Sequence, residues 1–310
     1  MSSDYPFTRN ATQHLNLELP LHLFDYDSAV PLDAHEQAMG VHEGLQWTHV
    51  TFSGGGGRRV PGVFVTEAHG TGSAHRAARS MPGVLLQHGA GASKYARFVT
   101  ACMDVLGHAG YACLALDAIG HGERSGAIAP EDEAAWRRLR GSPEFVTDNV
   151  VDFRRGLDYL AAQPEVDGAR LAYAGSSMGA MLGAILGAID PRPRVVILRC
   201  GGARTGLPAR VDSAGREEEE SSGARFELLD HLRYVGHIAP RPLLMLNNTE
   251  DEVFGRDAVL RLFEAAGEPK ELRWFPGDHR ANHELHAAEV LEWLEKWFRL
   301  AQFNPSGTKR

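Results

Sequence analysis

The chain has 310 residues, 43% of them hydrophobic, with a formal net charge of −8 and an isoelectric point near 6.0. This length and composition can form one large α/β core or two small ones, and one domain with an N-terminal extension is the simpler prediction. Because the charge is acidic and the sequence has no basic stripe or aromatic-basic platform, it predicts no nucleic-acid partner.

Cysteine content and the N-terminus bear on the compartment. The three cysteines, Cys102, Cys113 and Cys200, are odd in number and have no metal-ligand spacing, so we expect buried free thiols in a reducing compartment. The first residues contain no basic segment followed by an apolar stretch, and no apolar run approaches the length of a membrane span. The sequence therefore predicts a soluble cytoplasmic protein without a membrane partner, and it indicates no particular oligomeric state.

Residues 1–45 show no clear pattern, because Pro20 and Pro31 interrupt any long helix. A β-hairpin follows, in which two strands, 47–52 and 60–65, flank a glycine run that supplies the turn. Beyond the hairpin, apolar strands alternate with helical patterns. The further predicted strands are 83–87, 111–116, 171–174, 195–198, 243–246 and 272–275. Several are continuous apolar runs, which are typical of parallel strands covered on both faces.

Three segments have helical patterns. Apolar residues recur with helical spacing between positions 150 and 160 and again over 290–298, which predicts one buried stripe on each helix. Residues 178–189 are apolar or small nearly all round, and this predicts a buried central helix that ends before Pro191. Residues 201–225 interrupt the alternation with a run of four glutamates. We interpret that run as a solvated face or loop.

The pentapeptide Gly175-Ser176-Ser177-Met178-Gly179 matches the G-x-S-x-G pattern between a predicted strand and a predicted helix. This setting is typical of a nucleophile elbow, a sharp turn that exposes the serine hydroxyl at the start of the helix. The glycines permit the close backbone approach that such a turn requires. We predict Ser177 as the nucleophile, with the N–H of Met178 pointing at the negative charge that develops in acyl transfer. Ser176 would pack or hydrogen-bond locally.

Polar residues directly follow two later strands, at the strand ends where open parallel sheets bind ligands. Asp251 follows strand 243–246, and His279 follows strand 272–275. Ser177, Asp251 and His279 thus occur in a chain order that suits a triad of nucleophile, acid and base. The alternatives are Glu250, Glu252 and Asp257 for the acid and His283 and His286 for the base.

The remaining histidines allow other interpretations. His279, His283 and His286 have a spacing that could suggest a metal, but no carboxylate or cysteine set completes a site. We therefore predict no metal, and we interpret His283 and His286 as water-exposed loop residues. His88 and His121 precede glycines in loops at strand ends, and we expect them to anchor loop backbone by hydrogen bonds.

From about residue 45 to the C-terminus the chain resembles α/β-hydrolases, and it is most similar to the dienelactone-hydrolase-like and acetyl-xylan-esterase-like branches. The motifs that carry this resemblance are 87–91 (QHGAG), 117–126 (DAIGHGERSG), 175–179 (GSSMG), 238–244 (IAPRPLL) and 248–251 (NTED). Five matches in the same order are far more specific than the serine motif alone. Two residues depart from the family pattern, since Asn248 stands where glycine is usual before the acid and Phe254 stands where proline is common.

The resemblance implies an α/β-hydrolase fold, with a mostly parallel central sheet flanked by helices. Residues 46–305 would form the catalytic domain and residues 1–45 an N-terminal extension. Cap-like insertions are expected at about 124–147 and 201–232, because both segments follow strands at the edge where the site would lie.

The resemblance also implies roles for the site residues. It favours Asp251 as the acid and His279 as the base, and it places the second oxyanion donor, beside Met178, at the N–H of Ala90. The predicted function is hydrolysis of a small-molecule carboxylic ester through an acyl-enzyme, without a cofactor. Amide or peptide hydrolysis by the same triad and a non-catalytic binding protein with this fold are the alternatives. Since the 201–232 insertion is polar, short acyl groups are expected.

Overall fold

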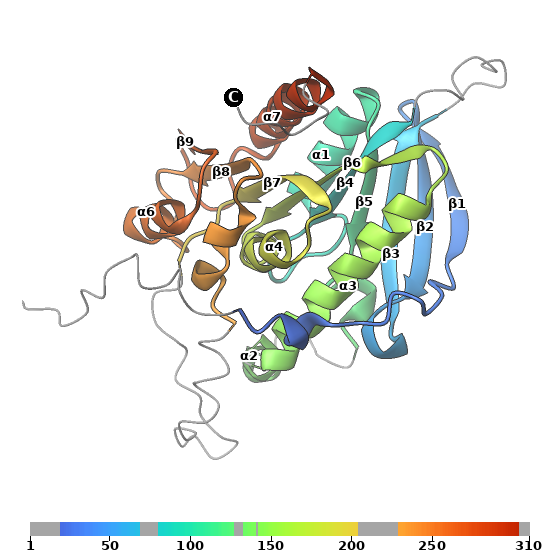
Figure 1. Ribbon diagram of the computed structural model, residues 1–310, viewed down its shortest axis with the longest axis horizontal. Coiled ribbons are helices and arrows are strands. Elements are labelled where there is room, and N and C mark those ends of the chain that lie inside the picture. The colour runs from blue at the N-terminus through green and yellow to red at the C-terminus, as the bar shows by residue number, and fades with distance from the viewer. Residues whose placement is uncertain (1–18, 69–79, 127–132, 141, 204–228, 304–310) are drawn as a thin grey trace, which may run out of the picture.

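The computed structural model describes residues 19–68, 80–126, 133–140, 142–203 and 229–303. These residues form three layers, in which helices cover both faces of one nine-stranded sheet (Figure 1). The mostly parallel sheet with flanking helices confirms the fold class predicted from the sequence.

The sheet has the strand order β1-β2-β3-β5-β4-β6-β7-β8-β9. Each neighbouring pair from β1 through β2 and β3 to β5 is antiparallel, whereas the six strands from β5 to β9 in this order run parallel. The bounds are β1 His35–His42, β2 Leu45–Ser53, β3 Arg59–Glu67, β4 Met81–Gln87, β5 Ala112–Leu116, β6 Val166–Ser176, β7 Pro193–Arg199, β8 Leu243–Asn248 and β9 Lys270–Phe275. The predicted hairpin and the six further predicted strands are all confirmed, while β1 was not predicted.

The described residues contain six α-helices, five between strands and α7 after the last strand. Their bounds are α1 Arg97–His108, α2 Glu133–Arg140, α3 Pro143–Ala162, α4 Met178–Ile189, α6 Arg256–Ala265 and α7 His283–Phe303. Helix α3 begins at a favourable sequence, because the Ser142 hydroxyl caps its first turn by accepting from the Phe145 N–H at 3.1 Å, and Pro143 occupies the first helical position. Helix α4 spans the predicted residues and ends before Pro191, as expected. None of the described helices is long and apolar enough to cross a membrane.

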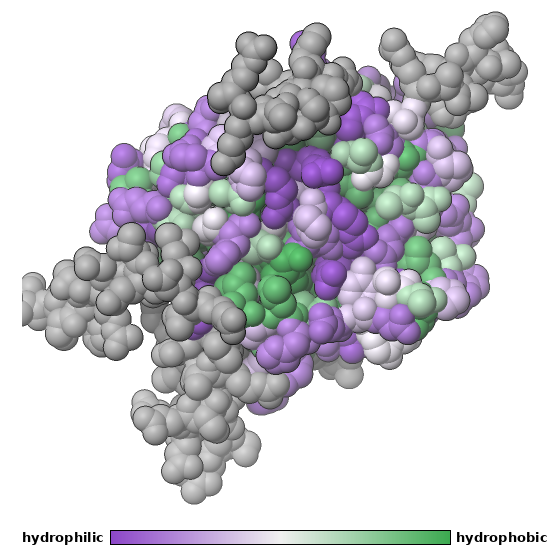
Figure 2. All heavy atoms as spheres, viewed as in Figure 1, coloured by the Kyte–Doolittle hydropathy of each residue, from purple (hydrophilic) through white to green (hydrophobic). Residues whose placement is uncertain are grey.

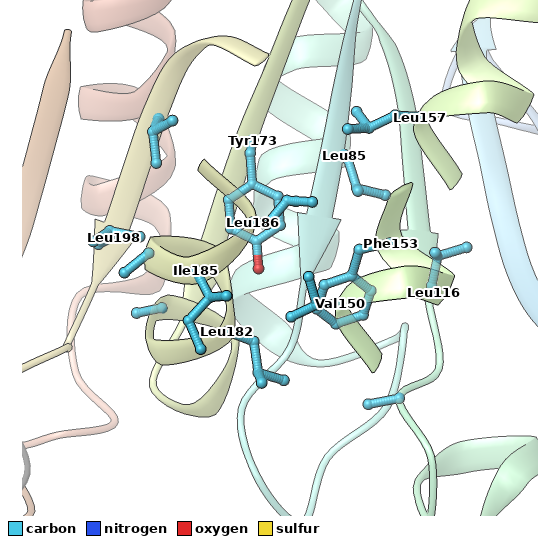
Figure 3. Packing of buried hydrophobic residues seen from close by; sticks show 14 of the residues in the cluster. Leu85, Leu116, Val150, Phe153, Leu157, Tyr173, Leu182, Ile185, Leu186 and Leu198 are labelled. Carbon is cyan, nitrogen blue, oxygen red and sulfur yellow. The ribbon is translucent and has the colours of Figure 1, made fainter. Parts of the chain in front are cut away.

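Two hydrophobic clusters lie on opposite faces of the sheet. One joins the strands to α3, α4 and α6, and the other joins them to α1 and α7. In the first cluster the fully buried Tyr173 of β6 lies beside Leu186 of α4, with Phe153 of α3 and Leu85 of β4 on the other side (Figure 3). Figure 2 shows that hydrophilic residues surround one apolar patch on the face that carries α3 and α4.

The described N-terminal residues 19–42 belong to the same structure. Residues 19–32 pass across α3, and the ring of Phe24 is fully buried and meets the ring of Tyr234 edge to face at 6.0 Å. Arg155 of α3 donates to the Val30 carbonyl at 2.8 Å, and the next residues form strand β1 at the edge of the sheet. Of the predicted insertions, residues 127–132, 141 and 204–228 lie outside the described residues, and so does the run of glutamates at 217–220.

Candidate active site

Ser177, His279 and Asp251 meet at the carboxyl ends of the parallel strands. Ser177 follows β6, Asp251 lies three residues after β8, and His279 lies four residues after β9. The Ser177 Oγ lies 2.9 Å from His279 Nε2, and His279 Nδ1 lies 2.8 Å from Asp251 Oδ2. Because a carboxylate accepts only, Nδ1 carries the proton and Nε2 is free to accept from the serine hydroxyl. The structure therefore brings the three predicted residues into one hydrogen-bonded chain.

The turn at Ser177 is a sharp elbow. Its backbone has φ 56° and ψ −112°, a conformation that a residue with a side chain rarely adopts. A Cβ on Gly175 would lie 2.4 Å from the Gly179 carbonyl oxygen, and one on Gly179 would lie 2.8 Å from the Gln87 carbonyl oxygen. Both glycines are thus required by contact with backbone, as predicted, and the packed turn holds Ser177 in its strained conformation.

The acid position is built around Asp251. Its Oδ1 accepts from the N–H groups of Val253 and Phe254, both at 2.8 Å, while Oδ2 accepts from His279. Burial raises the pKa of the Asp251 carboxyl, but the hydrogen bonds from His279 and the backbone outweigh burial and hold the pKa below its usual value. Asp251 is therefore ionised and oriented at neutral pH.

The alternative acids lie elsewhere. Glu250, Glu252 and Asp257 are exposed, and Glu252 accepts only from the backbone N–H of His279, at 3.1 Å. The side chain of His279 is 13% exposed and that of Asp251 is 1% exposed. Only Asp251, among these acids, contacts the imidazole of His279 in the described structure.

The prediction for the other two histidines was wrong. His283 and His286 do not lie in an exposed loop, because helix α7 begins at His283; His283 is half-buried and His286 is fully buried. Burial and the charge of Arg199 lower the pKa of His286 to about 3, so its ring is neutral and accepts from Arg199 Nε at 2.9 Å. Neither histidine replaces His279 beside the Ser177 hydroxyl.

The loop that follows β4 passes close to the nucleophile. A Cβ on Gly89, the residue before Ala90, would lie 3.2 Å from the Ser177 Cβ. Met178 is the first residue of α4, where a helix leaves its N–H groups without partners inside the helix. Of the two residues predicted to supply oxyanion donors, Met178 directly follows Ser177 and Ala90 directly follows Gly89, which packs against Ser177.

Buried polar groups anchor the loop after β4. The N–H of Lys94 donates to Asp117 Oδ1 at 2.8 Å, and the Lys94 ammonium donates to Asp117 Oδ2 at 2.5 Å and to Glu123 at 2.6 Å. Hydrogen bonds to these carboxylates outweigh burial and raise the pKa of the Lys94 ammonium. Lys94 is 1% exposed and Asp117 is fully buried. The sequence did not single out this lysine, because nothing local distinguishes it from a surface residue.

His88 and His121 bind backbone, as expected. His88 Nε2 accepts from the Ala118 N–H at 3.1 Å and its Nδ1 donates to the Gly89 carbonyl at 2.7 Å, while His121 Nδ1 donates to the Ile119 carbonyl at 2.9 Å. Burial lowers the pKa of His88 to about 4, which keeps this ring neutral and its acceptor free.

One group of side chains in the described structure has the composition of a metal site. Ligand atoms of Cys200, Asp251 and His279 lie within 4.8 Å of one another, which is not the histidine triplet considered from the sequence. Burial raises the pKa of the Cys200 thiol to about 12, so a proton would have to leave before this sulfur could bind a cation. The other two residues are already hydrogen-bonded to each other. All three cysteines are buried and free.

Two further site residues emerge only in the structure. The side chain of Asn248 donates to the Asp278 carbonyl at 2.6 Å and accepts from Asn282 at 3.0 Å. A glycine, which is usual at this position in the similar hydrolases, could make neither bond. Arg199, at the end of β7, is 2% exposed and lies between the elbow and the His279 loop. In the sequence, the one sign that could have pointed to Arg199 was its position directly after the apolar run of the predicted strand 195–198.

The chain is similar to known esterases in sequence and in fold. No protein-family model matches the chain. It is 28% identical over 229 residues to the esterase YjfP of Escherichia coli K12, a match that covers 68% of this chain and 87% of that protein. Among solved structures, it is similar to acetyl xylan esterase 1 from Thermoanaerobacterium sp. JW/SL YS485, with a TM-score of 0.70, 16% identity, and coverage of 93% of each chain.

A cold-adapted esterase from an Arctic intertidal metagenomic library is a further structural match. Its TM-score is 0.62 at 23% identity, and the match covers 83% of this chain and 96% of that one. These likenesses confirm the α/β-hydrolase fold and the predicted resemblance to acetyl-xylan-esterase-like hydrolases.

Proposed function

We propose that the protein is a serine hydrolase that cleaves carboxylic esters through an acyl-enzyme, with Ser177 as nucleophile, His279 as base and Asp251 as acid. The observation that carries this proposal is the hydrogen-bonded chain from Ser177 Oγ through His279 to Asp251. Ester hydrolysis as the reaction is supported by the esterase YjfP, to which the chain is similar over 87% of that protein.

Each residue has a chemical task in this mechanism. His279 Nε2 takes the proton of the Ser177 hydroxyl as Oγ attacks the ester carbonyl carbon, and the imidazolium returns that proton to the leaving alkoxide. Asp251 holds the tautomer in which Nε2 accepts, and its negative charge stabilises the imidazolium. Water then attacks the acyl-enzyme with His279 again as base, which releases the acid and restores Ser177.

The charge on the tetrahedral intermediate needs two donors. We assign them to the N–H groups of Met178 and Ala90, the first at the start of α4 and the second in the loop beside Ser177. The N-terminus of α4 adds a favourable dipole. Loss of one such donor typically reduces turnover ~10²–10³-fold. Because Lys94 anchors the loop that carries the Ala90 N–H, we count Lys94 among the residues that support the site.

A serine-directed fluorophosphonate tests the nucleophile. The wild-type protein should label at Ser177, as located by peptide mass spectrometry, and Ser177→Ala should not label and should lose ester hydrolysis by ~10⁶-fold in kcat. Ser176→Ala is the matched control, because it changes the neighbouring serine and should still label. A folded wild-type protein that neither labels nor cleaves esters would instead support a non-catalytic binding protein. Parallel assay of matched anilides and esters tests the amidase alternative.

We further propose a preference for short acyl groups and a cytoplasmic location. The 201–232 insertion is polar and contains four consecutive glutamates, so it offers little apolar surface to bury a long chain at ~0.8 kcal/mol per CH₂. Acetyl to butyryl esters should therefore have a higher kcat/KM than esters of ten or more carbons. A series that peaks at long chains would contradict this. The three buried free cysteines support the location.

A further inference from the structure

The guanidinium of Arg199 links two loops of the candidate active site. Its Nη1 donates to Ser176 Oγ at 2.8 Å, and Ser176 precedes the nucleophile. Its Nη2 donates to the carbonyl of Ala281 at 2.7 Å and lies 3.4 Å from that of His279. The planar guanidinium thus connects the elbow to the backbone of the loop that carries His279.

The backbone of the same residue also holds the elbow. The carbonyl of Arg199 accepts from the Ser177 N–H at 2.8 Å, in a turn where Ser177 has a positive φ. Backbone and side chain of Arg199 therefore hold two consecutive residues of the elbow, Ser176 and Ser177. The strained serine is fixed from the side opposite the Gly89 loop.

Arg199 has an unusual set of partners for a buried cation. The hydrogen bonds go to a hydroxyl, to backbone carbonyls and to the His286 ring, all of them neutral. Burial lowers the pKa of the Arg199 guanidinium from its usual value, which reflects the cost of keeping this charge away from water. A well-packed apolar side chain would often serve stability as well or better. The directional donors of the guanidinium are what an apolar side chain cannot replace.

We propose that Arg199 is a positioning residue that keeps the Ser177 hydroxyl and the His279 imidazole at hydrogen-bonding distance. The inference rests on the proposed function, because that distance matters most if His279 takes the serine proton. Because the guanidinium is buried and bonded to protein groups of the described structure, it has no free donor side facing solvent, and we expect its loss to lower kcat and to leave KM nearly unchanged. Misplacement of reacting groups by about 1 Å costs ~10²-fold in rate, and we expect a loss of that order in kcat for Arg199→Met.

A matched control separates positioning from stability. Arg155 is also buried, 3% exposed, and its guanidinium donates to the backbone carbonyls of Ser53 and Val30 and, unlike that of Arg199, to a carboxylate, Asp158 Oδ2 at 2.9 Å. It lies on α3, holding the N-terminal segment rather than the site. Arg155→Met should lower the midpoint of urea unfolding but leave kcat per folded molecule unchanged. Arg199→Lys keeps the charge without the planar fork and should lose less activity than Arg199→Met.

The experiment measures kcat and KM on an acetyl ester for folded protein, with the urea midpoint of each variant. It also records the low-field proton NMR resonance of His279 Nδ1–H, a signal of the Asp251 hydrogen bond that needs no catalysis. We expect this resonance to broaden or shift in Arg199→Met and to persist in Arg155→Met. If Arg199→Met does not fold, two milder variants replace it: Arg199→Lys, and Ser176→Ala, which removes only the contact with the elbow. Both should show smaller changes in kcat and in the His279 resonance, in the same direction.

The outcomes distinguish the two proposals. If the wild type cleaves no ester, the proposed function fails, and the NMR comparison still decides whether Arg199 positions the imidazole. If Arg199→Met retains the wild-type resonance and kcat per folded molecule, or if Arg155→Met loses as much kcat, Arg199 is only a structural residue and the inference is overturned.

Discussion

Replacing Gly175 by alanine should disable the elbow while leaving every proposed catalytic side chain in place. A Cβ at this position would lie 2.4 Å from the Gly179 carbonyl oxygen and 2.6 Å from the Tyr173 hydroxyl, where ordinary contact begins at 3.4 Å. The Gly179 carbonyl already accepts from the Tyr173 hydroxyl at 2.6 Å, so neither atom has free space. The first turn of α4 must therefore shift by about 1 Å, and a shift of that size costs ~10²-fold in rate.

The stability cost should be modest by comparison. Overpacking of a filled interior typically costs ~1–3 kcal/mol, which a folded domain can tolerate. The matched control is Gly187→Ala, on the same helix, whose Cβ would meet only side-chain atoms of Ile238 and Val196 at 3.2 Å. These side chains can adjust, and alanine favours the helix by ~0.5–1 kcal/mol over glycine.

The assay is hydrolysis of p-nitrophenyl acetate, with the concentration of active sites taken from fluorophosphonate titration and the folded state checked by urea unfolding. We expect Gly175→Ala to lose about two orders of magnitude in kcat and Gly187→Ala to keep the wild-type value. A folded Gly175→Ala protein with more than a tenth of the wild-type kcat would show that the elbow is not held as tightly as its contacts indicate.

Three further predictions concern the groups around the triad. His279→Ala should reduce kcat about as much as loss of the nucleophile, and Asp251→Asn should cost less, ~10⁴-fold, because the acid is the least costly member of such a triad; steady-state kinetics would contradict this if the order were reversed. Burial lowers the pKa values of His88 and His286 to about 4 and about 3, so both rings bind protons more readily in the unfolded chain. The contribution of these neutral rings to stability should therefore be fully present above about pH 6.5 and should fall as pH drops toward 4, by up to ~1.4 kcal/mol per pH unit for each ring. A urea midpoint that stays constant from pH 7.5 to 4.5 would exclude this. Lys94→Met should destabilise the protein by ~3–5 kcal/mol, because it leaves a buried carboxylate without its counter-charge; a smaller change in the unfolding free energy would mean that water or another cation replaces the ammonium.

The elements and the residues of the proposed triad could be predicted from the sequence because both depend on local properties. Alternation, apolar runs and helical spacing report which segments are buried, and the G-x-S-x-G glycines report a backbone contact within five residues. The helix over 178–189 was predicted at its observed bounds for this reason. Ser177, Asp251 and His279 each lie within four residues of the end of a recognisable strand, so their shared edge of the sheet followed from the parallel topology.

Tertiary structure decided which polar groups meet across that edge. In the sequence, His286 is an alternative to the nearby His279 as the candidate base. In the structure, helix α7 places His286 in the core, where it contacts Arg199, 87 positions away in the chain. Strand β1 is exposed at every residue and pairs with β2 at the edge of the sheet, so it lacks the alternation that would predict it. The partners of Arg199 lie on β6, on α7 and in the loop before α7, and those of Asn248 lie in that same loop, so these contacts depend on the packing of whole elements. Local patterns record burial and backbone sterics, whereas the pairing of buried polar side chains depends on where distant loops come together in space.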